Sequence, residues 1–424
     1  MINWSTTFIL LNLIQFIHCG KRHESASYTE TYHESGHFWR SRGKQPSKNY
    51  HQGGLHASGN NNQYGDGAEI GTAEENYYYD HNFCLRFKDE FNELNTDIWQ
   101  RDVTLWGGGN NEFQWYTDSP KNSYVKDGLL HITPTFTVDE LEGYNRHEYF
   151  MNGYSVDLSN QGCTTKAISN DTCYRKSDPT AGTIVNPIRS SALRSINKIK
   201  LKYGKIDIRL KLPKGDWLWP AIWLLPNDNV YGGWPQSGEI DILESRGNQN
   251  ANGFNGEGRE TARSTLHWGP RWDANGFPLT SGSIYIPPTY DDFHTYSLTW
   301  TPDGIFTSVD DPTPGRKYRS SQAQSLWELG QFNKTNPEFT NNIWNQQVPH
   351  SPFDQEFYII MNLAVGGTTG FFGDDLNGKP WKNSMAQGVA AKHFWKDRNR
   401  WEPTWGSAYD RSLVIDEIKV FDMC

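Results

Sequence analysis

The sequence predicts an all-β protein built as a sandwich of two curved antiparallel sheets, with one concave face open to a ligand. Three observations support this fold class. Short apolar runs alternate with polar residues at a period of two, clusters of Gly and Pro separate these runs, and no sustained helical period or internal repeat occurs. Two such sheets bury one face each against the other, so an outer face stays free for a ligand.

Three segments show the strand signals most plainly. Residues 206–212 alternate Ile or Leu with charged side chains, which is typical of a half-buried strand. The continuous apolar run at 357–361 indicates a central strand, and the run at 414–421 predicts a final strand. All three lie within residues 83–424, which we interpret as the folded domain.

The N-terminal residues differ in composition and apolar pattern from this domain. Residues 1–19 hold an apolar run too short to span a bilayer, which predicts a secretory signal peptide; an apolar but disordered N-terminus is the alternative. Residues 20–82 are polar and lack an apolar period, so we expect a disordered leader. A binding arm for a surface or partner is the alternative for this leader.

Composition and charge exclude some functions and favour others. The net charge of −9 comes without a basic stripe, which argues against nucleic-acid binding. No run after residue 19 is long enough for a transmembrane helix. From the expected signal peptide we expect a secreted, extracellular protein, and we also expect a monomer with no membrane partner. The 18 Trp residues suit a protein that handles a flat, polar ligand, although aromatic side chains also fill protein cores.

The cysteines support export. Removal of Cys19 with the signal peptide leaves Cys84, Cys163, Cys173 and Cys424, an even set that suits two disulfides in an oxidising compartment. Three pairings are open. We favour Cys163 with Cys173, which staples one loop, and Cys84 with Cys424, which ties the first strand to the last. No CxxC pair occurs, so no zinc site is predicted.

The acidic segment at 237–245 carries the chemistry. Side chains alternate along a strand, so Glu239 and Asp241 share one face. Glu244 lies five positions beyond Glu239 and would point to the opposite face of a regular strand. One extra residue in a β-bulge restores all three acids to one face. We therefore predict a bulge near Ile242 and Leu243.

Three carboxylates on one strand face repel each other, which costs stability and raises the pKa of at least one of them. A carboxyl with a raised pKa can donate a proton near neutral pH, as glycoside hydrolysis requires. An acidic strand that faces solvent, or a calcium site, is the alternative. The surrounding Trp residues weigh against it, because sugar rings stack on indoles.

Four Trp residues lie close to the acids, namely Trp217, Trp219, Trp223 and Trp234. Side chains that alternate on strands cannot all lie in the core, so some of these indoles should line the cleft. We expect Trp219 and Trp234 to be sugar platforms, and Trp223 to be either a platform or a core residue.

A family resemblance extends along nearly the whole of residues 83–424. Its segments are DEFN at 89–92, GGGNNEFQWY at 107–116, YGKIDIRLKLPKGDWLWPAIWLLP at 203–226, SGEIDILES at 237–245, LHWGP at 266–270, FHTYSLTWTPDGI at 293–305, FYIIMNLAVGG at 357–367 and LVIDEIKVF at 413–421. Together they resemble glycoside hydrolase family 16, in particular its animal laminarinase-like β-1,3-glucanases and β-1,3-glucan recognition proteins of innate immunity.

The resemblance implies a β-jelly-roll sandwich with an open cleft and a retaining endo-hydrolase of β-1,3-glucan. It implies that Glu239 is the nucleophile, Glu244 the acid/base and Asp241 an assisting residue. No cofactor and no catalytic metal are expected, while a structural calcium ion stays open. Residues 83–424 would then form the catalytic domain.

The resemblance also implies a set of substrate contacts. They are Asn110, Trp115, Arg194, Trp219, Trp234, His267 and Trp268. Each of four has a structural alternative: His267 as a buried histidine, Asn110 as a turn cap, Arg194 as an ion-pair partner and Trp115 as a core residue.

Three functions fit these residues. Retention of all three acids and a short, polar leader favour a hydrolase over a non-catalytic glucan sensor. A transglycosylase would use the same acids and differ only in whether an acceptor sugar outcompetes water. The linkage preference, digestive or immune use, and the role of the leader are not determined by the sequence.

Overall fold

The computed structural model describes residues 82–165, 172–249, 258–286, 292–310, 316–319 and 324–424. They lie in one structural unit, which begins at Thr72. The expected signal peptide (1–19) and nearly all of the expected leader (20–82) fall outside the described residues.

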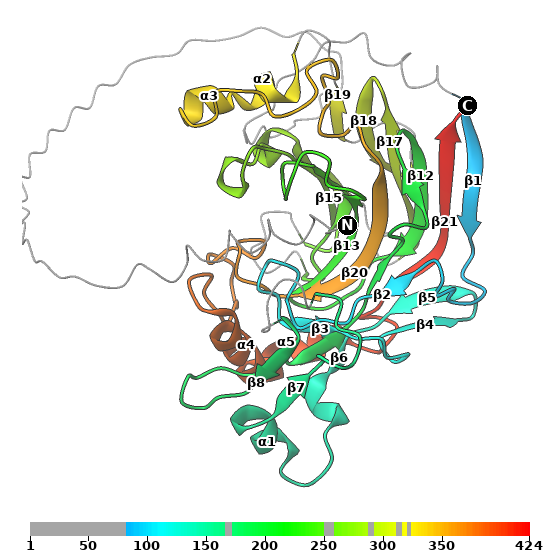
Figure 1. Ribbon diagram of the computed structural model, residues 1–424. Helices are drawn as coiled ribbons and strands as arrows, with labels where there is room; N and C mark the ends of the chain where they lie inside the picture. The colour runs from blue at the N-terminus through cyan, green and yellow to red at the C-terminus, as the bar shows by residue number, and fades with distance from the viewer. Residues whose placement is uncertain (1–81, 166–171, 250–257, 287–291, 311–315, 320–323) are drawn as a thin grey trace, which may run out of the picture. The chain divides into compact units, whose positions relative to one another are not determined.

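Most strands of the described residues belong to two large sheets, A and B, that pack face to face (Figure 1). Sheet A has the order β19 (Arg316–Arg319), β18 (Gly304–Val309), β17 (His294–Thr301), β12 (Gly204–Lys211), β21 (Leu413–Met423), β5 (Leu129–Ile132) and β4 (Ser123–Lys126), with β1 (Phe83–Asp89) also paired to β21. All its pairings are antiparallel.

Sheet B lies beside sheet A, and its strands curve visibly (Figure 1). Its order is β16 (Ser281–Tyr285), β15 (Thr261–His267), β14 (Glu239–Glu244), β13 (Leu218–Pro226), β20 (Phe357–Val365), β10 (Ala192–Arg194) and β2 (Gln100–Arg101), with β11 (Lys200–Leu201) also paired to β20. The architecture is the predicted β-jelly-roll sandwich, and the three strands expected from the sequence correspond to β12, β20 and β21.

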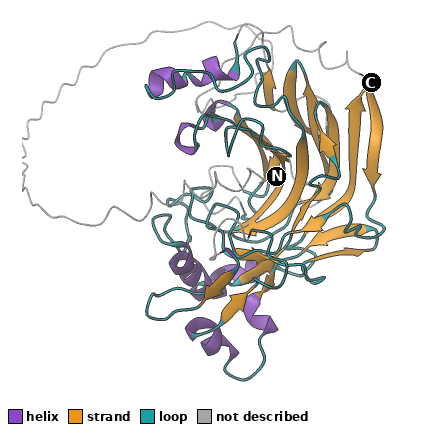
Figure 2. Cartoon of the chain, in the orientation of Figure 1, coloured by secondary structure: helices purple, strands orange, loops and turns teal. Residues whose placement is uncertain are grey.

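Two small sheets and short helices lie outside the sandwich (Figure 2). The small sheets are β3 (Gln114–Tyr116), β9 (Ile188–Ser190) and β6 (Thr135–Phe136), and β7 (Ser155–Asp157) with β8 (Tyr174–Lys176). The helices are η4 (Thr137–Glu140), α1 (Arg146–Asn152), η7 (Trp272–Ala274), η8 (Phe277–Leu279), α2 (Leu326–Gly330), α3 (Phe332–Thr335), α4 (Gln387–Lys396), α5 (Arg398–Trp401) and η9 (Glu402–Trp405).

The sequence showed no helical period, yet α4 forms over ten residues. It buries Ala390, Ala391, Phe394 and Trp395 on one face. A helix of this length completes fewer than three turns, at about 3.6 residues a turn, so its apolar spacing repeats too few times to stand out. Within the described part of the chain, no helix combines the length and apolar character needed to cross a membrane.

The core lies between the two sheets. Ile206, Ile208 and Leu210 of β12 are buried from sheet A, and Ile222 and Ile240 are buried from sheet B. Because side chains alternate along each strand, the neighbours of Ile222 and Ile240 point to the outer face of sheet B. This outer face carries the acids.

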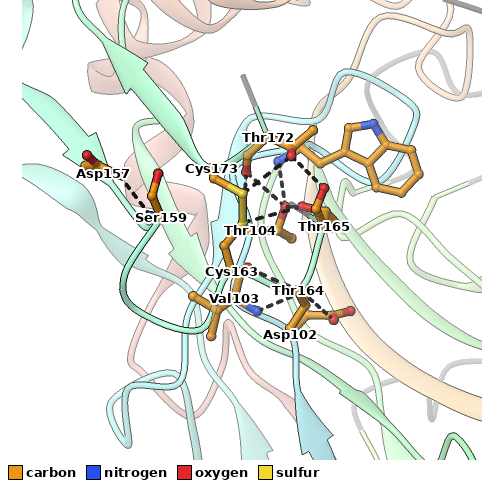
Figure 3. The surroundings of a disulfide bond; sticks show 11 residues. Asp102, Val103, Thr104, Asp157, Ser159, Cys163, Thr164, Thr165, Thr172 and Cys173 are labelled. Carbon is orange, nitrogen blue, oxygen red and sulfur yellow. Dashed lines mark hydrogen bonds between the residues drawn. A yellow bond between two sulfur atoms is a disulfide. The ribbon is translucent and has the colours of Figure 1, made fainter. Parts of the chain in front are cut away.

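Both predicted disulfides are confirmed. Cys84 of β1 bonds to Cys424 at the end of β21, and Cys163 bonds to Cys173. The second bond closes a loop whose Thr164 hydroxyl donates to Asp102 (Figure 3). The first therefore ties the chain's last strand to its first, and the second braces the start of the segment that follows β2.

Candidate active site

The predicted bulge lies at Ile242. On β13, Trp223 pairs with Asp241 and the preceding Ile222 pairs with Leu243, so Ile242 has no counterpart. The pairing with β15 skips at the same place. The extra residue shifts the alternation of β14 by one position, as the spacing of the acids requires.

The bulge brings the three acids to one face. Glu244 pairs with Ala221 and Asp241 pairs with Trp223, and residues two apart on β13 face the same side of the sheet. Glu239, two residues from Asp241, shares that side. All three carboxyls therefore lie on the outer face of sheet B.

His267 of β15 lies across from the acids. It pairs with Glu239 in the ladder, and its Nε2 atom is 3.7 Å from a Glu239 oxygen and 3.3 Å from Asp241 Oδ2. Its ring also lies near the indole of Trp234, with 5.5 Å between centroids. His267 is thus part of the acid cluster, and the substrate contact expected of it stays a prediction.

Asn275 fixes where His267 carries its proton. The Asn275 Oδ1 atom accepts hydrogen bonds from the backbone N–H groups of Trp268 and Phe277, so its Nδ2 must face the ring. That Nδ2 donates to His267 Nδ1 at 2.9 Å. Nδ1 is therefore an acceptor, and the neutral ring carries its hydrogen on Nε2, the nitrogen nearer the carboxyls.

Two indoles hold the two glutamates. Trp219 donates from Nε1 to Glu244 Oε1 at 3.0 Å, and Trp234 donates from Nε1 to Glu239 Oε2 at 2.8 Å. Trp219 is 7% exposed and stacks flat on Phe371, with 3.8 Å between centroids, whereas Trp234 is 47% exposed. Trp234 can therefore serve as the predicted sugar platform. The platform role expected for Trp219 is corrected, because Phe371 covers its ring and its indole N–H positions Glu244.

Burial and mutual repulsion keep protons on the acids. Burial raises the pKa of Glu239 to about 8, the charges of Asp241 and Glu244 add to the rise, and His267 and Trp234 oppose it. Burial also raises the pKa of Asp241 well above its ordinary value, and that of Glu244 to a lesser degree. A protonated and an ionised carboxyl can therefore exist side by side near neutral pH.

A fourth carboxyl, Glu112, was missed by the sequence reasoning. It is buried, accepts hydrogen bonds from Gln114 and Asn110, and interacts electrostatically with Glu244. Burial raises its pKa to about 7. The only signal was its place within GGGNNEFQWY, where an acid beside Asn and Gln does not reveal that it will be buried.

Two predicted contacts, Asn110 and Arg194, are partly exposed and already have protein partners. Asn110 Oδ1 accepts from the Thr369 hydroxyl at 2.6 Å, besides the bond from its amide to Glu112. Arg194 forms an ion pair with Asp102 at 2.6 Å, and Asp102 is held in turn by the disulfide loop (Figure 3). Both roles toward a ligand stay predictions.

Two other predicted contacts are corrected. Trp268 is fully buried and packs against Phe332 and Trp344, so it has no ring face to offer a sugar. Trp115 is buried in the core, donates to Thr137 and lies under a guanidinium, in agreement with its structural alternative. Trp223 donates to Asn362 and is partly exposed.

One group in the described part of the chain has the composition of a metal site. Ligand atoms of Glu239, Asp241 and His267 lie within 4.8 Å of one another. The nitrogen of His267 that faces the acids carries a hydrogen in the assigned tautomer, so it has no lone pair for a metal there. The cluster fits proton transfer better than metal binding.

A β-sandwich that presents buried carboxyls beside an exposed indole belongs to the carbohydrate-active class of proteins. The family model described as Glycosyl hydrolases family 16 matches residues 147–357. A beta-1,3-glucan-binding protein of Penaeus monodon is 38% identical over 350 residues, which cover 80% of this chain and 90% of that protein. This chain belongs to glycosyl hydrolase family 16, which implies no cofactor.

Two further proteins are similar to this chain. A glucan endo-1,3-beta-glucosidase of Cryptopygus antarcticus is 32% identical over 316 residues, which cover 74% of this chain and 89% of that protein. The X-ray structure of the laminarinase from Rhodothermus marinus aligns with a TM-score of 0.48 and 27% identity, over 81% of this chain and 99% of that one. Relatives therefore include both a protein named for binding and a protein named for hydrolysis.

Proposed function

We propose that this protein is a secreted, retaining endo-hydrolase of β-1,3-glucan. The observation that carries this proposal is the bulged strand β14, which gathers Glu239, Asp241 and Glu244 on the outer face of sheet B beside the exposed indole of Trp234. A purely structural strand gains nothing from three mutually repelling acids gathered on one face.

The proposed reaction runs in two steps. The reaction starts from the state in which Glu244 holds the proton and Glu239 is ionised, which is the minor state at neutral pH because the pKa of Glu239 is about 8. In that state Glu244 donates its proton to the glycosidic oxygen while an ionised oxygen of Glu239 bonds to the anomeric carbon and the glycosidic bond breaks. Glu244, now a carboxylate, takes a proton from a water molecule whose oxygen attacks the same carbon and releases Glu239. Two inversions at one carbon retain its configuration.

The neighbouring groups support these roles. The Trp219 indole holds Glu244 in place, and the Trp234 indole holds Glu239. Asp241 lies beside Glu239 and raises its pKa, whereas His267, with Nε2 3.7 Å from a Glu239 oxygen, lowers it. As charge leaves Glu239 during attack, both groups can adjust its proton affinity.

Secretion and the domain division complete this proposal. The two disulfides suit an oxidising compartment. We assign residues 1–19 to a signal peptide, 20–82 to a polar leader and 83–424 to the catalytic domain, acting on its polysaccharide outside the cell.

Release of reducing sugar from laminarin tests the hydrolase proposal. The wild-type protein is expected to release it, and Glu239→Gln and Glu244→Gln are expected to lose at least about 10³-fold in kcat, because each removes a group that reacts. Glu402→Gln, at an exposed site in η9, is the matched control. Equal release by wild type and Glu239→Gln would refute the assignment.

The 38% identity to a β-1,3-glucan-binding protein favours a second candidate, binding without turnover. It predicts that laminarin binds to the wild-type protein while no product forms. Product analysis on laminarin, lichenan and xyloglucan separates the two candidates and gives the linkage preference. Longer products than the starting chains would instead indicate transglycosylation.

A further inference from the structure

Aromatic side chains continue past the candidate active site, beyond Trp234. The Trp234 and His267 rings lie 5.5 Å apart, and the Phe277 ring follows at 5.2 Å from His267, inclined by 30°. Phe277 is 40% exposed. One side of its ring therefore rests on His267, while much of the rest is open to solvent next to the acids.

The chain holds Phe277 in a fixed position. Gly276, just before it, donates its N–H to the Trp268 carbonyl, and a Cβ at Gly276 would lie 2.5 Å from the buried Trp268 ring. The Phe277 N–H itself donates to Asn275 Oδ1. A ring that is already ordered loses little entropy when a ligand stacks on it.

The exposure of Phe277 is not isolated. Trp272 and Leu279 in the same short segment are 66% and 49% exposed. Single exposed apolar residues are ordinary, but several beside a functional site indicate an interaction surface. This surface, formed by Trp272, Phe277 and Leu279, is called the distal aromatic surface below.

The charges nearby favour a neutral ligand. Arg271, the basic residue of this segment, forms salt bridges with Asp273 and Glu338, so its charge is matched by carboxylates. An anionic lipid surface or polyanion would find no excess of positive charge there. A glucan chain is uncharged, and the apolar faces of its rings suit exposed aromatic side chains.

We propose that Phe277 stacks on a glucose ring of the same β-glucan chain that occupies the active site, and that Trp272 extends this contact along the polymer. The proposal rests on the proposed function, since it needs a glucan in the site. It follows that long chains bind more tightly than short ones, because short chains end before they reach the distal aromatic surface.

Binding measured without turnover tests this inference. In the Glu239→Gln background, calorimetry gives Kd for laminarin and for laminari-oligosaccharides of increasing length. Phe277→Ala is expected to weaken laminarin binding about five- to tenfold, the range of one lost aromatic contact, while Phe277→Tyr keeps it. Trp272→Ala, which leaves the contact of Phe277 with His267 intact, is expected to weaken laminarin binding about twofold or more and disaccharide binding not at all.

Tyr174→Ala provides the matched control, because Tyr174 is an exposed aromatic residue on β8, outside sheet B. Laminarin binding within twofold of the background for both Phe277→Ala and Trp272→Ala would overturn the inference while leaving the proposed function intact. A background protein that binds no β-glucan would overturn both. Thermal unfolding of each variant, with Phe277→Tyr as reference, shows that lost binding is not lost folding.

Discussion

The two ends of β14 hold their glutamates in different ways. At one end, Glu244 is bonded to Trp219, whose ring is covered by Phe371. At the other end, Glu239 is bonded to Trp234, whose ring is largely exposed. The same indole–carboxylate bond thus serves two purposes: the Glu244 end is packed for positioning, and the Glu239 end is left open to a ligand.

Charge separates the two ends as well. Arg263, Arg246 and His267 all lower the pKa of Glu244 and partly offset its burial. Glu239 receives such help from His267 and the Trp234 bond, and Asp241 lies beside it. At the open end, fewer favourable interactions therefore offset the burial of the acid, and the pKa of Glu239 is about 8. The end of β14 that a ligand can reach is thus also the end where a charged carboxylate costs more free energy.

The largest expected effect separates the chemistry of the two ends. Glu239→Gln and Glu244→Gln should both lose at least about 10³-fold in kcat/KM on laminarin. With an aryl glucoside, whose leaving group needs no proton, Glu244→Gln should recover most of the rate of the first step, because this variant lacks only the proton donor. Glu239→Gln should not recover that rate, because it lacks the nucleophile. Burst kinetics with that substrate measure the step. If Glu239→Gln recovered this rate instead, Glu239 would be the proton donor and Glu244 the nucleophile.

The next effect compares the two indoles. Trp219→Phe leaves the buried Glu244 oxygen without its donor, so it should lower the free energy of unfolding by about 1–3 kcal/mol. Trp234→Phe removes a bond at an exposed ring, and we expect a loss of at most about 1 kcal/mol. Urea unfolding at pH 7 measures both. Equal losses would mean that the two ends are packed alike.

A smaller effect should follow from Asn275→Asp. The new carboxylate keeps the bonds from the Trp268 and Phe277 N–H groups, but it can only accept a hydrogen bond, so His267 Nδ1 must donate one where it now accepts one from Asn275. The ring then either loses the Nε2–H that faces the acids or becomes positively charged beside them. We expect kcat/KM at neutral pH to fall about tenfold, with a displaced pH–rate profile.

The readouts for Asn275→Asp are the pH dependence of kcat/KM and the ¹⁵N chemical shifts of the His267 ring. Asn342→Asp is the control, because Asn342 Oδ1 also accepts a backbone N–H, in its case from Trp344. An unchanged profile, together with unchanged ring shifts, would contradict the role of Asn275.

The acids and their bulge could be predicted because both depend on local sequence. Alternation along one strand places Glu239 and Asp241 together, and the spacing to Glu244 requires one extra residue, found at Ile242. The even count of cysteines left three disulfide pairings open, and the favoured one, Cys163 with Cys173 and Cys84 with Cys424, is the one that forms.

The Trp roles could not be predicted because exposure depends on distant partners. Trp268 is buried by Phe332 and Trp344, and Trp219 is covered by Phe371, all far away along the chain. No pattern near either indole indicates these contacts. Local periodicity shows which side of a strand a side chain takes, whereas loops that fold over that side decide whether a ligand can reach it.

The last expected effect is on stability, and it depends on pH. The pKa of Glu239 is about 8 in the folded protein, above its ordinary value of 4.5, so between these values the folded state holds a proton that the unfolded state has released. Stability therefore falls as pH rises through this range. Glu239→Gln removes this titration and keeps an oxygen for Trp234, so it should gain about 1 kcal/mol or more over wild type between pH 5 and pH 8.

Unfolding free energies of both proteins across this range measure the gain, and Glu402→Gln, at an exposed carboxyl, should run parallel to wild type. A difference between Glu239→Gln and wild type that is constant with pH would mean that the folded protein does not hold a proton on Glu239. The open end of β14 would then carry no electrostatic cost, and the contrast with the Glu244 end would be one of packing alone.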